Sequence, residues 1–140
     1  MIQYKHKLLT GDCLIHEDFV PSMDLFCRYL EIVKCSAIIN SSFRKDANVK
    51  GAIVTPATKS NHMVGCAIDC NILDSKNVLW NSEKMEKPKD EVLQFINLVR
   101  RSKLLRWGGD FKTIDTVHFD NALNINSPTR WQEIYIELHK

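Results

Sequence analysis

The chain has 140 residues, of which 44% are hydrophobic and 26% are charged, and its formal net charge is +2 at pH 7. This composition excludes a disordered or fibrous chain, and the length is sufficient for one domain with its own core. The balanced charge argues against a dedicated nucleic-acid binder, and the apolar runs are too short to span a bilayer. We therefore expect a single domain over residues 1–140, without a transmembrane segment, that acts as a monomer.

The N-terminus and the cysteines indicate where the protein is made. Residues 1–7 lack the long apolar region and the cleavage site of a secretory signal. The cysteines are odd in number and include no Cys-x-x-Cys pair: Cys13, Cys27, Cys35, Cys66 and Cys70. Such a set favours free buried thiols over a disulfide framework, so we expect synthesis in the reducing cytoplasm.

The first half of the chain contains one predicted helix and two predicted strands. Glu17–Cys35 has apolar residues at helical spacing, with Pro21 near the first turn. Ser36–Phe43 contains a short apolar run and is typical of a buried strand, and Cys66–Leu73 alternates like another strand. The intervening residues 45–59 contain glycine, proline and small polar residues, which predicts a loop.

The second half begins with a polar stretch, Asp74–Lys89, that we expect to be an exposed insertion or a lid. Asp90–Lys103 then has apolar residues at helical spacing. Leu104–Trp107 and Thr116–Phe119 are short predicted strands around a turn at the two glycines 108 and 109.

The C-terminal segment predicts a last helix. Ser127 and Pro128 are typical of a helix start, with serine as the N-cap and proline at the first helical position. Apolar residues follow at helical spacing. Helices that flank and interrupt short strands indicate the α+β class, with a small sheet covered by helices.

Four side chains have the chemistry of a zinc hydrolase. Such an enzyme needs about three ligands from His, Asp, Glu or Cys, and a carboxylate that takes a proton from water. His62 and Asp69 can face the same side if His62 lies on a loop leading into the strand of Asp69, and His118 is the natural third ligand. Asp115, three residues before it, could reach the attacking water. Taken singly, each histidine is more often a surface or core residue, and Asp115 a turn residue.

Several short motifs resemble a known family. The pattern SxHxxGxAxD is formed by Ser60, His62, Gly65, Ala67 and Asp69. It resembles the zinc-binding signature of the D-alanyl-D-alanine carboxypeptidase and L-alanyl-D-glutamate endopeptidase family, which includes VanY-like carboxypeptidases and phage endolysins. Residues 107–111 (WGGDF) and 115–119 (DTVHF) are similar to two further motifs of that family. Residues 41–44 (SSFR) are similar to its SGYR stretch, with two substitutions.

The resemblance implies a fold and a set of roles. The fold would be the small antiparallel α+β fold shared with the hedgehog signalling domain. His62, Asp69 and His118 would bind Zn²⁺, and Asp115 would be the general base that activates the attacking water and later protonates the leaving amine.

The resemblance also implies roles in substrate binding. Arg44 would steady the substrate carbonyl or grip a substrate carboxylate; a surface cation is the alternative. Ser60 and Trp107 would support the ligands from behind or line the substrate pocket, with ordinary core packing as the alternative for Trp107. Asp110 would hold the turn through hydrogen bonds to backbone.

Two further groups of residues need no role in chemistry. Cys66 and Cys70 flank Asp69 but alternate away from it in a strand, so we expect them in the core. The cations Arg100, Arg101, Lys103 and Arg106 surround the end of a predicted helix, where we expect a solvated face. Attraction to an anionic cell wall is the alternative.

The function implied by the resemblance is hydrolysis of an amide bond in a peptidoglycan stem peptide. An aspartate at position 115 together with the WGG segment is more similar to the endolysin branch, which favours an L-alanyl-D-glutamate endopeptidase. A D-alanyl-D-alanine carboxypeptidase or dipeptidase, a non-catalytic zinc-binding module and a virion structural protein are the alternatives. An enzyme of the endolysin type would act on the wall after release from the cytoplasm.

Overall fold

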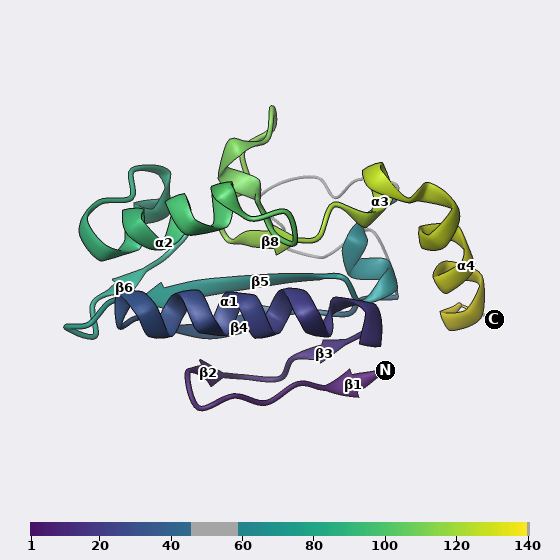
Figure 1. Cartoon of the computed structure of the whole chain (residues 1–140), viewed down its shortest axis with the longest axis horizontal. Helices are drawn as coiled ribbons and strands as arrows, with labels where there is room; N and C mark the ends of the chain where they lie inside the picture. The colour runs from purple at the N-terminus through teal and green to yellow at the C-terminus, as the bar shows by residue number, and fades with distance from the viewer. Residues whose placement is uncertain (46–58, 140) are drawn as a thin grey trace.

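A computed structural model describes residues 1–45 and 59–139. Nearly all of the loop predicted for residues 45–59 lies outside the described residues. The main sheet has six strands in the order β2-β4-β5-β8-β7, with β6 also paired to β5 (Figure 1). Its strands are β2 (Leu9–Thr10), β4 (Ser36–Ser41), β5 (Ala67–Leu73), β6 (Leu79–Trp80), β7 (Arg106–Trp107) and β8 (His118–Asp120).

Most of this sheet is antiparallel, as expected, but β2 pairs with β4 in parallel. The N-terminal strands were not predicted, because two-residue strands are too short to show a period of two. A separate antiparallel pair joins β1 (Ile2–Gln3) to β3 (Leu14–Ile15). The α+β class is confirmed, with a main sheet that is antiparallel except at the edge where β2 pairs with β4.

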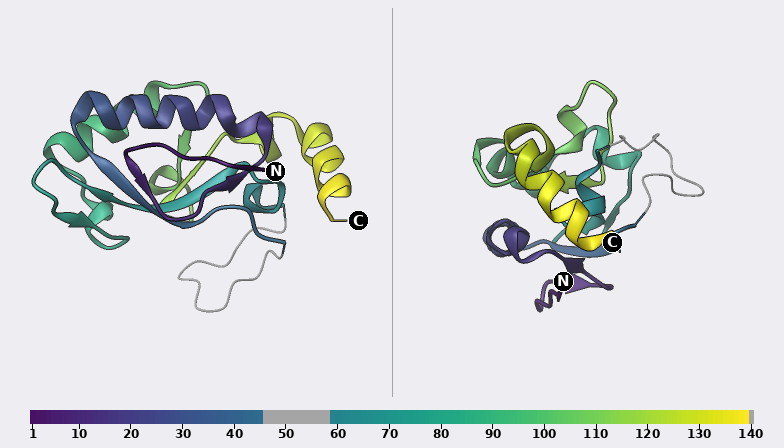
Figure 2. Two further views of the ribbon diagram at one scale, coloured as in Figure 1. Left: turned by 90° about the horizontal axis from the view of Figure 1, so that it is seen from below. Right: turned by 90° about the vertical axis from the view of Figure 1, so that its right-hand side faces the viewer.

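Two helices cover one face of the main sheet (Figure 2). A short 3₁₀ turn, η1 (Glu17–Phe19), leads into α1 (Val20–Val33), and α2 (Asp90–Arg101) packs beside it. Both helices lie where the spacing of apolar residues predicts them.

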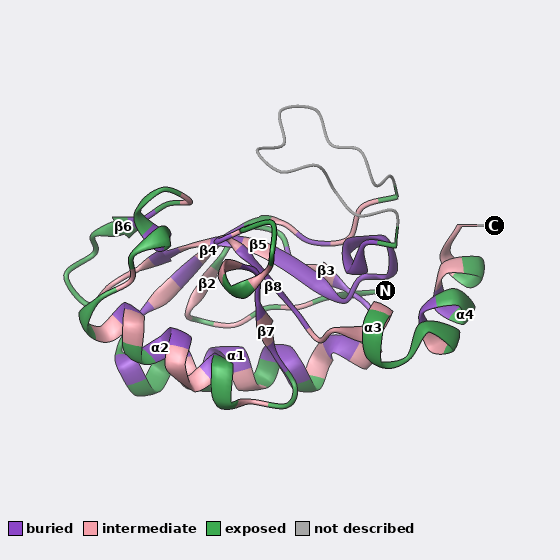
Figure 3. Cartoon of the chain, turned by 90° about the horizontal axis from the view of Figure 1, so that it is seen from above, coloured by how far each residue is buried: buried purple, intermediate pink, exposed green. Residues whose placement is uncertain are grey.

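Three phenylalanines join these helices to the sheet. Phe26 of α1, Phe95 of α2 and Phe119 of β8 are fully buried, and their ring centroids lie 5.1–5.8 Å apart in edge-to-face pairs. Along β5 and on the sheet-facing side of α1, the buried residues in Figure 3 trace the same core.

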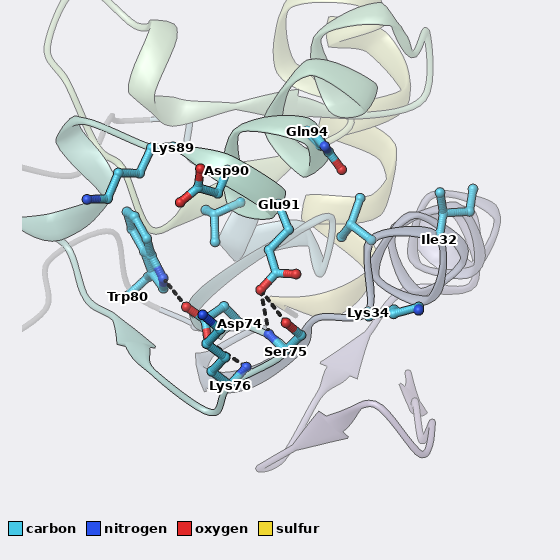
Figure 4. A pocket seen from close by; sticks show the side chains of 12 residues that line it. Ile32, Lys34, Asp74, Ser75, Lys76, Trp80, Lys89, Asp90, Glu91 and Gln94 are labelled. Carbon is cyan, nitrogen blue, oxygen red and sulfur yellow. Dashed lines mark hydrogen bonds between the residues drawn. The ribbon is translucent and has the colours of Figure 1, made fainter.

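Most residues of the segment 74–89 are exposed, as its polarity predicts, but two of its side chains are buried in the core. Trp80 pairs with Ile72 of β5, and both Trp80 and Met85 are buried in the core. The Trp80 indole donates to Asp74, and the backbone N–H and hydroxyl of Ser75 donate to Glu91 at 2.7 Å (Figure 4). Two large apolar side chains therefore anchor a segment whose charged neighbours remain exposed.

A hollow of about 540 Å³ lies between this segment and the two helices. It is lined by residues of α1, of the β5–β6 turn and of the start of α2, among them Lys34, Asp74 and Glu91 (Figure 4). None of the four side chains with hydrolase chemistry lines this hollow.

The C-terminal residues form two helices beside the turn η2 (Asn61–Val64). The predicted last helix is α4 (Pro128–Leu138), preceded by α3 (Leu123–Asn126), which was not predicted. Ser127 is the N-cap residue, as predicted, but its side chain makes no capping hydrogen bond. The Trp131 indole donates to the carbonyl of Ser60 at 3.3 Å, which ties α4 to η2.

All five cysteines are free and buried, as predicted, and Cys66 and Cys70 lie in the core. In the described part of the chain, no helix is both long and apolar enough to cross a membrane.

Candidate metal centre

The register of three strands assembles one side of the candidate site. Asp69 of β5 lies opposite His118 of β8, and Arg106 of β7 lies opposite Asp120 of β8. Since alternate residues of a strand share a face, His118 and Asp120 point to the side opposite Phe119, which is in the core. This face of the sheet is therefore polar where the other is aromatic.

His62 reaches the same place from the turn before β5. The Ser60 hydroxyl accepts a hydrogen bond from the backbone N–H of His62 at 3.2 Å and caps the η2 turn. Gly65 ends the turn with φ of +69°, and an added Cβ would lie 2.6 Å from the backbone nitrogen of His16. Only glycine fits there without strain, so the glycine of the motif shapes the turn that carries the first histidine.

Three side-chain atoms converge between η2, β5 and β8. Nε2 of His62 lies 3.2 Å from Oδ1 of Asp69, and Nδ1 of His118 lies 3.5 Å from the same oxygen. One ligand atom from each of the three residues lies within 4.8 Å of the others. The structure thus brings together the three residues predicted to bind a metal.

This donor set fits zinc. Two imidazoles and a carboxylate are common zinc ligands, and bonds of about 2.0–2.1 Å place tetrahedral ligand atoms about 3.4 Å apart. The observed separations of 3.2 and 3.5 Å match that spacing. Three protein ligands leave the fourth position of a catalytic zinc site for water or substrate.

Each histidine is held from its far side by an acceptor. Nδ1 of His62 lies 2.7 Å from the carbonyl oxygen of Ser42, and Nε2 of His118 lies 2.7 Å from Oδ2 of Asp120. In a metal-bound form, protons on these two nitrogens would leave the lone pairs of the opposite nitrogens free to face the metal position. The SSFR stretch therefore supports the site partly through a backbone carbonyl.

Asp120 is a further residue of the candidate site, which the motifs did not indicate. It is 1% exposed and accepts hydrogen bonds from Arg106 at 2.8 and 2.9 Å and from the Asn61 amide at 3.1 Å. The predicted strand ended at Phe119, one residue short. The alternation of His118 and Asp120 about that phenylalanine is the signal that could have found it.

Arg44 lies beside the carboxylate of Asp69. Its Nη1 donates to Oδ2 of Asp69 at 3.4 Å and to the hydroxyl of Ser41 at 3.2 Å. Its buried Nε has no hydrogen-bond partner among the described residues. The guanidinium thus holds one carboxylate oxygen while Oδ1 faces the two histidines.

The charges around Asp69 keep it ionised. Burial alone would raise the pKa of Asp69, but hydrogen bonds from His118 and His62 outweigh it and lower the pKa well below its usual range. The contact with Asp69 also changes the pKa of His118. Burial would lower the pKa of His118, but the carboxylates of Asp120 and Asp69 raise it to about 9.

Asp115 is held next to His118 by a tight turn. Its backbone N–H donates to the carbonyl of Gly108 at 2.9 Å, and its own carbonyl accepts from the N–H of His118 at 3.2 Å. A Cβ at Gly108 would lie 2.2 Å from the Asp115 carbonyl oxygen, so only glycine permits this approach. The indole of Trp107 donates to the carbonyl of Thr116 at 2.8 Å and braces the same turn.

The carboxyl of Asp115 is half-buried and within electrostatic reach of the ligands. Burial raises its pKa, and repulsion from Asp69 adds to the rise, while His118, His62 and Arg44 oppose it. A carboxylate whose pKa is raised accepts a proton more readily than an ordinary aspartate. This is the property that a general base beside the metal position needs.

The remaining residues of the motifs have mainly supporting contacts. Ser60 is buried at the cap of η2, and Trp107 is 4% exposed in the core. The Ser60 hydroxyl supports the turn that carries His62, and the Trp107 indole supports the turn that carries Asp115. Direct binding of substrate by either residue stays a prediction. Asp110 does not hold backbone as predicted: it forms a two-pronged ion pair with Arg100 at 2.9 Å.

Three cations of the basic cluster are exposed, as predicted, and the fourth, Arg106, is half-buried. Arg100 and Arg106 are each committed to a carboxylate, and Arg101 donates to the carbonyl of Asn97. The Arg106 side chain is 28% exposed because it turns inward to Asp120. Two of the four cations near the helix end are therefore paired with carboxylates of the fold.

A second group of potential ligands, His16, Glu17 and Asp18, does not form a comparable site. Nδ1 of His16 accepts from the backbone N–H of Asp18 at 3.0 Å and caps the η1 turn. The Asp18 carboxylate is paired with Arg130 at 2.8 and 3.2 Å. These contacts explain the cluster without a metal.

A family model and a solved structure resemble this chain. No curated protein matches the chain. The structure is similar to that of the Serratia marcescens L-Ala D-Glu endopeptidase ChiX, with 18% sequence identity, 79% of this chain and 83% of that chain covered, and a TM-score of 0.49. Residues 54–121 match the family model described as D-alanyl-D-alanine carboxypeptidase, and this segment contains both histidines, Asp69 and Asp115. The matched segment also carries the SxHxxGxAxD, WGGDF and DTVHF motifs, so over these residues the chain is similar to that family.

Proposed function

We propose that the protein is a zinc-dependent peptidoglycan peptidase that hydrolyses an amide bond of the stem peptide. One observation carries the proposal: two imidazole nitrogens and a carboxylate oxygen converge at the spacing of a tetrahedral zinc site, within electrostatic reach of Asp115. His62, Asp69 and His118 would hold the metal. When bound, zinc lowers the pKa of water and polarises a carbonyl.

The protein's own residues would complete the reaction. Asp115 would take the proton of the attacking water and return it to the leaving amine, a shuttle that its raised pKa favours. Arg44 would stabilise the negative charge that develops on the carbonyl oxygen, because its cation already lies at the edge of the site.

Two bonds of the stem peptide are candidate substrates. The aspartate at position 115 and the WGG segment resemble the endolysin branch, which favours cleavage between L-alanine and D-glutamate. The family description favours removal of a terminal D-alanine as the second candidate. The two reactions release different products and are separated by mass.

Digestion of purified muropeptides, followed by mass spectrometry, tests the proposal. We expect the zinc-loaded wild type to release fragments cut between L-alanine and D-glutamate; loss of a single D-alanine would support the second candidate. Intact muropeptides with a zinc-loaded wild type would contradict both and leave a non-catalytic zinc-binding module. Elemental analysis of the wild type beside His62→Ala shows whether the metal is bound where proposed.

We also propose that the protein is a monomer made in the cytoplasm that meets the cell wall after release. Five buried, unpaired thiols are typical of synthesis in a reducing compartment. Size-exclusion chromatography with light scattering tests the monomer, and lysis of cell walls by added protein tests access to the substrate from outside.

A further inference from the structure

The environment of Asp120 goes beyond what zinc ligation alone requires. Asp120 is 1% exposed, and its two carboxylate oxygens receive contacts from β7, β8, η2 and the N-cap residue of α3. Oδ2 lies 2.7 Å from His118 Nε2, 2.8 Å from Arg106 Nη2 and 3.1 Å from Asn61 Nδ2. Oδ1 accepts from Arg106 Nε and from the backbone N–H of Ala122, both at 2.9 Å.

Asn61 extends this network to the other histidine. Its amide group donates to Asp120 and to Asn124, and its carbonyl accepts from the backbone N–H of Asn124 at 3.0 Å. Asn61 directly precedes His62 within η2. One carboxylate is thus in contact with a zinc-ligand ring on β8 and with the turn that carries the second ring.

We infer that Asp120 is a positioning residue that presets both histidines for the metal, directly at His118 and through Asn61 at His62, with Arg106 fixing its orientation. The inference rests on the proposed zinc site. A carboxylate behind a ligating histidine fixes the ring's proton and orientation, and its loss typically lowers metal affinity about 10–100-fold.

Asparagine at position 120 would place a donor NH₂ group where the aspartate has an acceptor oxygen. All of the partners of the carboxylate act as donors, so an NH₂ group in place of either oxygen would face donors. If the NH₂ group took the place of Oδ2, it would donate to Nε2 of His118. The ring proton would then sit on Nδ1, the nitrogen that faces Asp69, and would oppose metal binding.

Zinc titration against a competing chelator tests the inference in the full-length protein. We expect Asp120→Asn to weaken zinc binding about 10–100-fold and to change the visible absorption spectrum of bound Co²⁺. Asp110→Asn is the matched control, because it also removes the partner of a two-pronged arginine but touches no histidine. Its zinc affinity and Co²⁺ spectrum should equal those of the wild type.

Thermal unfolding of the metal-free variants separates positioning from a purely structural role. If Asp120→Asn lowers the unfolding temperature but binds zinc with wild-type affinity and an unchanged Co²⁺ spectrum, the inference is wrong. If that variant does not fold, Arg106→Lys tests the inference instead. It keeps the positive charge but loses the two-pronged hydrogen bonding to Asp120. A several-fold weaker zinc affinity of Arg106→Lys supports the inference, and wild-type affinity overturns it. A wild type that binds no zinc would instead overturn the proposed function.

Discussion

Asp115 differs from the three ligand residues in what its removal should do. It contacts the site from the turn before β8 and is not one of the converging ligand atoms. We expect Asp115→Ala to lower kcat by about 10²–10⁴-fold, the usual contribution of a general base, while zinc content is unchanged. His118→Ala should lose the metal itself. Steady-state kinetics and metal analysis of the same samples check both, and near-normal activity of Asp115→Ala would exclude it as the base.

The protonation of His118 should make the proposed zinc binding depend on pH. In the metal-free protein its pKa is raised to about 9, so the protonated ring contributes stability that is complete below about pH 6.5 and is lost as pH rises through about 9. Zinc requires the neutral ring and must displace this proton. We expect zinc affinity to rise about tenfold per pH unit between about pH 7 and 9. Chelator competition across this range measures it, and an affinity that is flat with pH would contradict the assignment.

At the scale of elements, the aromatic cluster couples the helices to the strand that carries His118. Phe26 of α1 contacts both Phe95 of α2 and Phe119 of β8. We expect Phe26→Ala to lower the free energy of unfolding by about 3–5 kcal/mol, because it leaves a cavity among fully buried rings.

Ile32 of the same helix offers the matched control. Its side chain is 60% exposed, so Ile32→Ala should change the free energy of unfolding by no more than about 0.5 kcal/mol. Chemical denaturation of the two variants measures the free energies of unfolding. Equal losses would contradict the packing of Phe26 in the core.

At the scale of the whole molecule, the five thiols should be protected by the fold. Burial raises the pKa of Cys27 to about 11 and those of Cys13, Cys35 and Cys66 to about 12. Burial also raises the pKa of Cys70. Since the thiolate is the reactive form, we expect a thiol reagent to label none of the five in the native protein and all five after denaturation. Labelling of a native thiol at a rate near that of free cysteine would show that the core opens readily.

The helices and central strands could be predicted because their signals are local. Apolar spacing predicted α1, α2 and α4, a short apolar run predicted β4, and alternation predicted β5, all close to their observed bounds. The anchoring of the segment 74–89 could not be predicted, because composition reports average polarity, whereas two buried side chains, Trp80 and Met85, decide its packing. The two-residue strands at the N-terminus could not be predicted, because they are defined by their pairing with other strands and not by a local pattern.

The sequence by itself determined the candidate ligands and the base, because their spacing and residue types repeat a family pattern that chemistry explains. Only the tertiary structure decided that Asp69 lies opposite His118 and that Arg106 lies opposite Asp120. Strand register depends on pairing between segments far apart in the chain, which no local pattern encodes. For the same reason the partners behind the histidines, the Ser42 carbonyl and Asp120, became visible only in the folded molecule.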